Sequence, residues 1–160
     1  MTRFALLFLA ILGGCQSAAR PSHWVNWNVP ITKSPDLCEL GPEAESFASL
    51  DAMPKPITDH FLSRLNAMFP VSNPIAARDQ VYDWSDVVRP GIPNRRFIQG
   101  GHRNDHWLIW YEHGSIGGNQ LAVVGYELAS TDAKPAILGG IKEWDRAQGP
   151  CKALIDFLYH

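Results

Sequence analysis

The run of residues 106–112 reads HWLIWYE and places large apolar side chains at consecutive positions. In a β-strand, successive side chains point to opposite faces of the sheet. One face would then carry Trp107, Ile109, Tyr111 and His113, and the other His106, Leu108, Trp110 and Glu112. Both faces are largely apolar in the middle, so both need a cover. We expect helices over one face, and the N-terminal segment, a second copy of the chain or a partner protein over the other.

Three further runs are rich in β-branched and aromatic residues and are bounded by turn residues: 96–99, 121–128 and 136–138. Such runs are typical of strands. Asn104-Asp105 suits a tight hairpin turn. The stretch 113–120 contains three glycines and is expected to form a longer, more mobile loop. The pattern predicts an antiparallel meander of three or four strands.

Apolar residues with helical spacing predict a helix over 57–69, which forms one stripe of Ile57, Phe61, Leu62, Leu65, Met68 and Phe69. Pro56 stands at its start and Pro70 ends it. A weaker helical pattern covers 43–52, and Pro74 is expected to begin a short helix through Arg78. A terminal helix begins at Pro150. The expected fold class is α+β: the meander packed with an N-terminal and a C-terminal helix.

Composition narrows the class of protein further. The chain has 160 residues, of which 46% are hydrophobic and 19% charged, and this suits one globular domain. Its net charge of -2 offers no large positive field for a nucleic-acid backbone, so we expect no nucleic-acid partner. Three cysteines exclude a disulfide-dense scaffold and an all-cysteine zinc site. No cofactor is expected.

The N-terminus has the parts of a secretory signal. It begins Met-Thr-Arg, continues with the unbroken apolar run 4–12, and reaches small residues at Gly13-Gly14. The run is too short to span a bilayer, which needs about 20 apolar residues. A buried core helix is the alternative interpretation, but such a helix normally has a polar face, and this run has none.

The residues Leu12-Gly13-Gly14-Cys15 resemble the lipobox of bacterial lipoprotein precursors. In that family the cysteine receives a diacylglyceryl group, the signal is cut just before it, and the new amine is acylated with a fatty acid such as palmitate. The resemblance implies that Cys15 becomes the first residue of the mature protein and anchors it in a membrane. It covers only this motif and the apolar run, and no family motif is recognised in the mature domain. The alternative is that Cys15 is an ordinary residue near a conventional cleavage site.

Gln16 follows the cysteine, in place of the Asp that resembles an inner-membrane retention signal. The resemblance therefore implies an outer-membrane location facing the periplasm. The expected organisation is a signal peptide over 1–14, a spacer over 15–35 and a single α+β domain over 36–160. The spacer is polar and contains three prolines.

Cys38 and Cys151 remain once Cys15 is acylated. An even pair of cysteines in an oxidising compartment predicts a disulfide. A redox-active thiol pair is the alternative, although such pairs usually have Cys-x-x-Cys spacing.

Residues 112–118 contain the candidate catalytic groups. His113 would act as the base for Ser115, or with Glu112, in acyl transfer. The segment does not match G-x-S-x-G, and adjacent strand residues point to opposite faces, so Glu112 does not simply orient His113. A Gly-rich connector is the plainer interpretation.

His102 and His106 flank the predicted hairpin turn and are the candidate metal ligands, with solvated turn positions as the alternative. His113 lies seven residues further along the strand, at about 3.3 Å per residue, so the three histidines would not meet. The densest positive charge is Arg95-Arg96, with Arg89 and Arg103 nearby. These arginines would bind a carboxylate, such as a peptide acid of peptidoglycan, or form a solvated edge.

Three hypotheses of function follow. The first is an outer-membrane binding or accessory module, including an inhibitor or immunity type, that meets a periplasmic protein through Trp107, Trp110, Tyr111, Gly114, Gly117 and Gly118. The second is an envelope hydrolase that acts on peptidoglycan or an ester through His113. The third is a structural component of the envelope.

Overall fold

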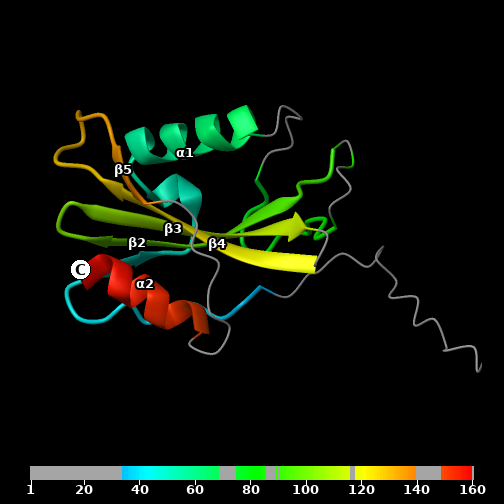
Figure 1. Ribbon diagram of the computed structural model, residues 1–160, viewed down its shortest axis with the longest axis horizontal. Helices are drawn as coiled ribbons and strands as arrows, with labels where there is room; N and C mark the ends of the chain where they lie inside the picture. Colours follow the sequence, from blue (N-terminus) through cyan, green and yellow to red (C-terminus); the bar gives the residue numbers. More distant parts are fainter. Residues whose placement is uncertain are drawn as a thin grey trace, which may run out of the picture.

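The computed structural model describes residues 34–68, 75–85, 89, 91–115, 118–139 and 149–159. Within them, a five-stranded antiparallel sheet lies between two helices, one on each face (Figure 1). The expected signal peptide, Cys15 and most of the spacer lie outside the described residues. Neither described helix is long and apolar enough to cross a membrane.

The strands follow one another in the sheet in chain order: β1 (Glu45–Phe47), β2 (Arg95–Arg103), β3 (His106–Ser115), β4 (Gly118–Glu127) and β5 (Ala136–Gly139). The α+β class with an antiparallel sheet is confirmed, but the strand count is five, not three or four. The strand missed is β1, where only three residues pair with β2. So short a strand shows no alternation, and the 3-10 helix η1 (Leu50–Ala52) follows at once.

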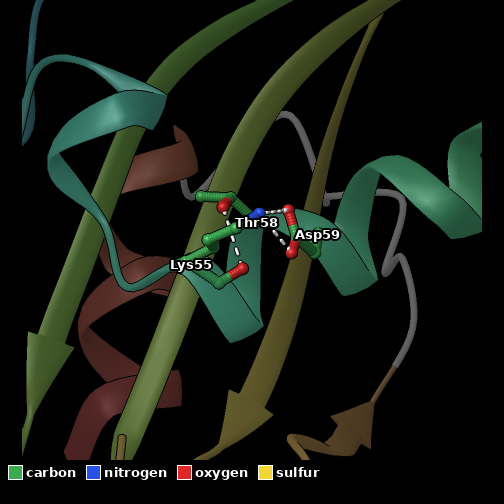
Figure 2. Close-up of polar contacts among 3 residues, drawn as sticks. All are labelled: Lys55, Thr58 and Asp59. Carbon is green, nitrogen blue, oxygen red and sulfur yellow. Dashed lines mark hydrogen bonds and ion pairs between the residues drawn. The ribbon is translucent and has the colours of Figure 1, made fainter.

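Helix α1 (Lys55–Met68) covers one face of the sheet, close to the predicted bounds. Ile57, Phe61 and Leu65 are buried in one core with the β3 residues Ile109 and Tyr111. Figure 2 shows the exposed side of the first turn, where Lys55 Nζ donates to Asp59 at 2.6 and 2.8 Å and the Thr58 hydroxyl donates to the Lys55 carbonyl. Exposed pairs of this kind contribute little. The buried stripe is therefore what attaches α1 to the sheet.

Helix α2 (Gly149–Tyr159) covers the opposite face (Figure 1). Leu154 and Leu158 are fully buried in a second core that contains Leu108 and Trp110 of β3. The cover expected from a second copy or a partner is thus supplied by the chain's own terminal helix, together with Cys38 and Leu40, which precede β1.

Strand β3 takes part in two hairpins, one with β2 and one with β4. The β2–β3 turn is as expected, and the β3–β4 connection is not. Asn104 adopts a positive φ of 57° in the two-residue turn between β2 and β3, as Asn tolerates. The long loop expected over 113–120 is wrong, because strand pairing continues to Ser115 and Gly118. Gly114 lies within the paired stretch, where its N–H donates to the Asn94 carbonyl and its missing side chain allows close approach of Ser85.

The disulfide between Cys38 and Cys151 is present, with a Cα–Cα distance of 5.2 Å. It joins the segment before β1 to α2. Gln99 of β2 holds the same segment, because its amide accepts from the Cys38 N–H and donates to the Cys38 carbonyl, each at 2.8 Å. Together these contacts hold the segment before β1 and helix α2 on the same face of the sheet.

Reducing the disulfide should strongly destabilise the domain. The bond closes a loop with a sequence separation of 113, and chain entropy assigns such a loop about 4–5 kcal/mol. Urea denaturation with and without a thiol reductant measures the loss. The Cys38→Ser, Cys151→Ser double variant is the control, since a reductant should not change its stability further. Equal stability of the oxidised and reduced proteins would contradict this prediction.

Replacing Gly114 should also destabilise the fold. A Cβ at this position would lie 2.1 Å from the Ser85 carbonyl oxygen, so backbone must move. We expect Gly114→Ala to cost about 1–3 kcal/mol in urea denaturation. Gly125→Ala is the comparison, because there the clash is with the Phe157 ring, which can rotate away, and the loss should be smaller. A larger loss at Gly125 than at Gly114 would show that this packing argument is wrong.

Candidate functional site

Two of the candidate catalytic residues, Glu112 and His113, lie on opposite faces of the sheet. His113 lies opposite Arg95 on the α1 face of the sheet, with its ring 6.1 Å from that of Tyr111. Glu112 lies on the other face and is 2% exposed. Ser115 ends β3, and its side chain lies outside the described part of the chain. Since Glu112 and His113 point to opposite faces, Glu112 does not orient His113.

Glu112 belongs instead to a buried ion pair. Its Oε2 accepts from Arg96 Nε at 2.9 Å and from the terminal guanidinium nitrogen at 2.6 Å. Arg96 is completely buried and its Cζ lies 4.6 Å from the centre of the Tyr82 ring. Burial, and then the nearby Glu112 carboxylate, raises the pKa of the Tyr82 phenol far above its ordinary value. This carboxylate is therefore bound to Arg96 and does not face His113.

The aromatic residues expected to meet a partner are buried. Trp107, Trp110 and Tyr111 are 9%, 1% and 3% exposed. Trp107 has Phe47 and His102 stacked against it, at ring distances of 5.7 and 3.9 Å. The expectation of an exposed aromatic face therefore fails for these three rings. Tyr111 is buried in the core under α1 and Trp110 in the core under α2, while Phe47 and His102 cover Trp107.

The expected glycine loop is short. Gly114 lies within β3 against Ser85, Gly118 begins β4, and Gly117 lies outside the described residues. A mobile plug was expected here. Over most of this stretch, strands β3 and β4 are instead paired as part of the sheet.

The register also separates the candidate metal ligands. His102 pairs with Trp107 and lies on the α1 face, whereas His106 pairs with Arg103 one position further along and points to the other face. Within the described ranges, no group of three His, Cys, Asp or Glu side chains is arranged to hold a metal ion.

The four arginines expected to form one positive region are separated by the fold. Arg89 pairs with Asp83 at 3.2 Å, and Arg96 with Glu112. Arg103 approaches Glu43 at 3.3 Å and lies 4.0 Å above the Tyr159 ring. Arg95, the fourth of these arginines, lines a groove.

The Arg95 groove is a cavity of about 690 Å³ between η1, the end of α1, segment 75–80 and the start of β2. Its lining consists of Ala48, Ser49, Leu50, Asp51, Leu62, Leu65, Asn66, Ile75, Ala76, Ala77, Arg78, Asp79, Gln80, Arg95 and Phe97. The helix expected from Pro74 to Arg78 is not formed over the described residues 75–78. Ala76 instead bridges to β2, donating to the Arg95 carbonyl and accepting from the Phe97 N–H, both at 2.9 Å. This bridge keeps segment 75–80 beside β2 as one wall of the groove.

Arg95 is the buried charge of the groove. It is 5% exposed, whereas the other charged lining residues, Asp51, Arg78 and Asp79, are exposed or half-buried. Burial lowers the pKa of Arg95, because a guanidinium loses hydration there. Leu62, Leu65 and Phe97 supply apolar surface. The groove thus combines apolar surface, several polar side chains and one buried positive charge, an arrangement suited to binding small ligands.

The sequence did not predict this groove, although it named Arg95 as a residue able to bind a carboxylate. The lining comes from four separate stretches of the chain, and no local spacing signals that they meet. Comparison with known proteins adds no further guide: no protein-family model, curated protein or solved structure matches the chain.

Breaking the buried ion pair should cost far more than breaking a surface pair. Arg96→Met leaves the Glu112 carboxylate buried without its guanidinium, and we expect a loss of about 3–5 kcal/mol in urea denaturation. The Arg96→Met, Glu112→Leu double variant should recover part of this loss, because it leaves no unpaired carboxylate at this position. Lys152→Ala removes the exposed pair with Asp156 and should cost under about 0.5 kcal/mol. Similar losses in Arg96→Met and Lys152→Ala would refute a structural role for the buried pair.

Proposed function

We propose that the protein is a lipid-anchored binding protein of the outer membrane that faces the periplasm. The lipobox-like Leu12-Gly13-Gly14-Cys15 supports the anchor. The disulfide supports an oxidising compartment, where such bonds persist. Of the three cysteines, two are in this bond, so Cys15 is the thiol left for acylation.

The Arg95 groove is the single observation that carries the binding role. It is concave, has both apolar and polar lining residues, and includes one buried arginine. Sites that bind small molecules or chain ends have this combination of apolar walls and a few fixed polar groups. The groove also lies on rigid elements, since β2 and α1 form part of it.

The envelope-hydrolase alternative has no support in the form that uses Glu112, because that carboxylate is bound to Arg96 on the opposite face of the sheet from His113. Its other form pairs His113 with Ser115, whose side chain lies outside the described part of the chain. Packing of Gly114 against the Ser85 backbone weighs against the inhibitor form that used Gly114–Gly118 as a mobile plug.

Acylation is tested by expressing the full chain in a bacterium with an outer membrane and feeding labelled palmitate. We expect label in the wild-type protein and its recovery with outer membranes, and neither in Cys15→Ala. Label that persists in Cys15→Ala, or an unlabelled soluble wild-type protein, would contradict the anchor.

The binding role is tested by crosslinking in the same cells. Ala77 lines the groove and is exposed, so Ala77→Trp should fill the groove and abolish the crosslinked product. Ala129→Trp is the matched control, because Ala129 is exposed and is not part of the lining. A product that survives Ala77→Trp would show that binding occurs elsewhere.

A further inference from the structure

We propose that the Arg95 groove binds a segment of a partner protein in which a Lys or Arg side chain is flanked by apolar residues. This inference rests on the proposed binding role of the groove and names the chemistry of its ligand. It depends on the exposed carboxylates and the apolar side chains of the lining. It does not depend on Arg95, which already has an interaction of its own within the protein.

The positive charge of the ligand follows from two carboxylates. Asp51 and Asp79 line the groove and are exposed, and among the described residues neither has an ion-pair partner. Arg78 also lines the groove, but its guanidinium donates to the Pro35 carbonyl, which is not part of the lining. Arg95 is 5% exposed. A ligand that enters from solvent therefore meets the two carboxylates, which attract a cation and repel an anion.

The apolar part of the ligand follows from side chains that the core covers only in part. Leu50, Leu62 and Ile75 pack on the core under α1, are half-buried, and line the groove. Apolar residues of a ligand would remove their remaining surface from water, which favours binding. A small inorganic cation would leave this surface exposed.

Amide side chains favour a peptide as the body of the ligand. Asn66 on α1 and Gln80 in segment 75–80 are exposed and line the groove. The Gln80 Oε1 accepts from the Ala77 N–H at 3.0 Å, which orients this side chain. Side-chain amides pair with the N–H and C=O groups of a peptide. The volume of about 690 Å³ is within the range of small-ligand sites, so it suits a few residues and not a folded domain.

The first test is calorimetric titration of the oxidised protein with acetyl-Leu-Lys-Leu-amide and with the peptides that carry Gln or Glu in place of Lys. We expect the Lys peptide to bind at least about fivefold more tightly than the Gln peptide, and the Glu peptide most weakly. n-Octylamine is a cation without peptide groups and should bind more weakly than the Lys peptide. Equal affinity for the three peptides, no binding of the Lys peptide, or a preference for n-octylamine would overturn the proposal.

Variants of the two carboxylates locate the binding site. The Asp51→Asn, Asp79→Asn double variant should lower the affinity for the Lys peptide to that for the Gln peptide. Both side chains are exposed, so the fold should tolerate these changes. Asp132→Asn is the matched control, because Asp132 is exposed and is not part of the lining. Undiminished affinity in the double variant, or an equal loss in Asp132→Asn, would overturn the proposal.

Crosslinking in cells tests the source of the ligand. A small diazirine side chain at position 66, which lines the groove, should crosslink to a protein. Mass spectrometry of the crosslinked fragment should find a Lys or Arg with apolar neighbours at the point of attachment. An acidic fragment at that point, or attachment only to a molecule that is not a protein, would contradict the proposal.

Failure of this inference is distinct from failure of the proposed function. If the cellular crosslink is lost in Ala77→Trp but the Lys peptide binds no better than the Gln peptide, the groove binds a different chemistry and only this inference fails. If the crosslink survives Ala77→Trp, the proposed role of the groove fails as well.

Discussion

The fold depends on a central strand that is apolar on both faces. In β3, Ile109 and Tyr111 pack against α1, and Leu108 and Trp110 pack in the core under α2. Burying a large apolar side chain contributes about 1.5–3 kcal/mol, so leaving either face uncovered would cost several such contributions. Both helices are therefore required, and the disulfide helps keep α2 in place.

This two-sided burial also decides where a ligand can be bound. The aromatic residues expected to contact a partner, Trp107, Trp110 and Tyr111, are buried. The buried Arg96–Glu112 pair and the close packing at Gly114 likewise belong to the framework at the far end of β3. The described part of the chain leaves a groove open at the last turns of α1, where segment 75–80 lies beside β2 and Arg95 is buried.

Much of this arrangement follows from local sequence pattern. The strands that become β2 to β5, the α1 stripe and the terminal helix were predicted because each has enough residues to show its period. The disulfide was predicted because Cys38 and Cys151 remain as an even pair once Cys15 is acylated. Strand β1 and the bridge at Ala76 were not predicted. The strand has three residues and the bridge has one, and neither is long enough to show a periodic pattern of apolar residues. The groove was missed because it is a property of packing between distant segments, and the burial of Trp107 and Trp110 depended on which elements cover the sheet.

The central claim is that binding occurs at the Arg95 groove and not at the β3–β4 hairpin. Photocrosslinking in cells tests it most directly, with a photoreactive side chain placed at position 77 in the groove or at position 120 in the hairpin. The account predicts a crosslinked product from position 77 and none from position 120. A product from position 120 alone, or the same product from both positions, would contradict it.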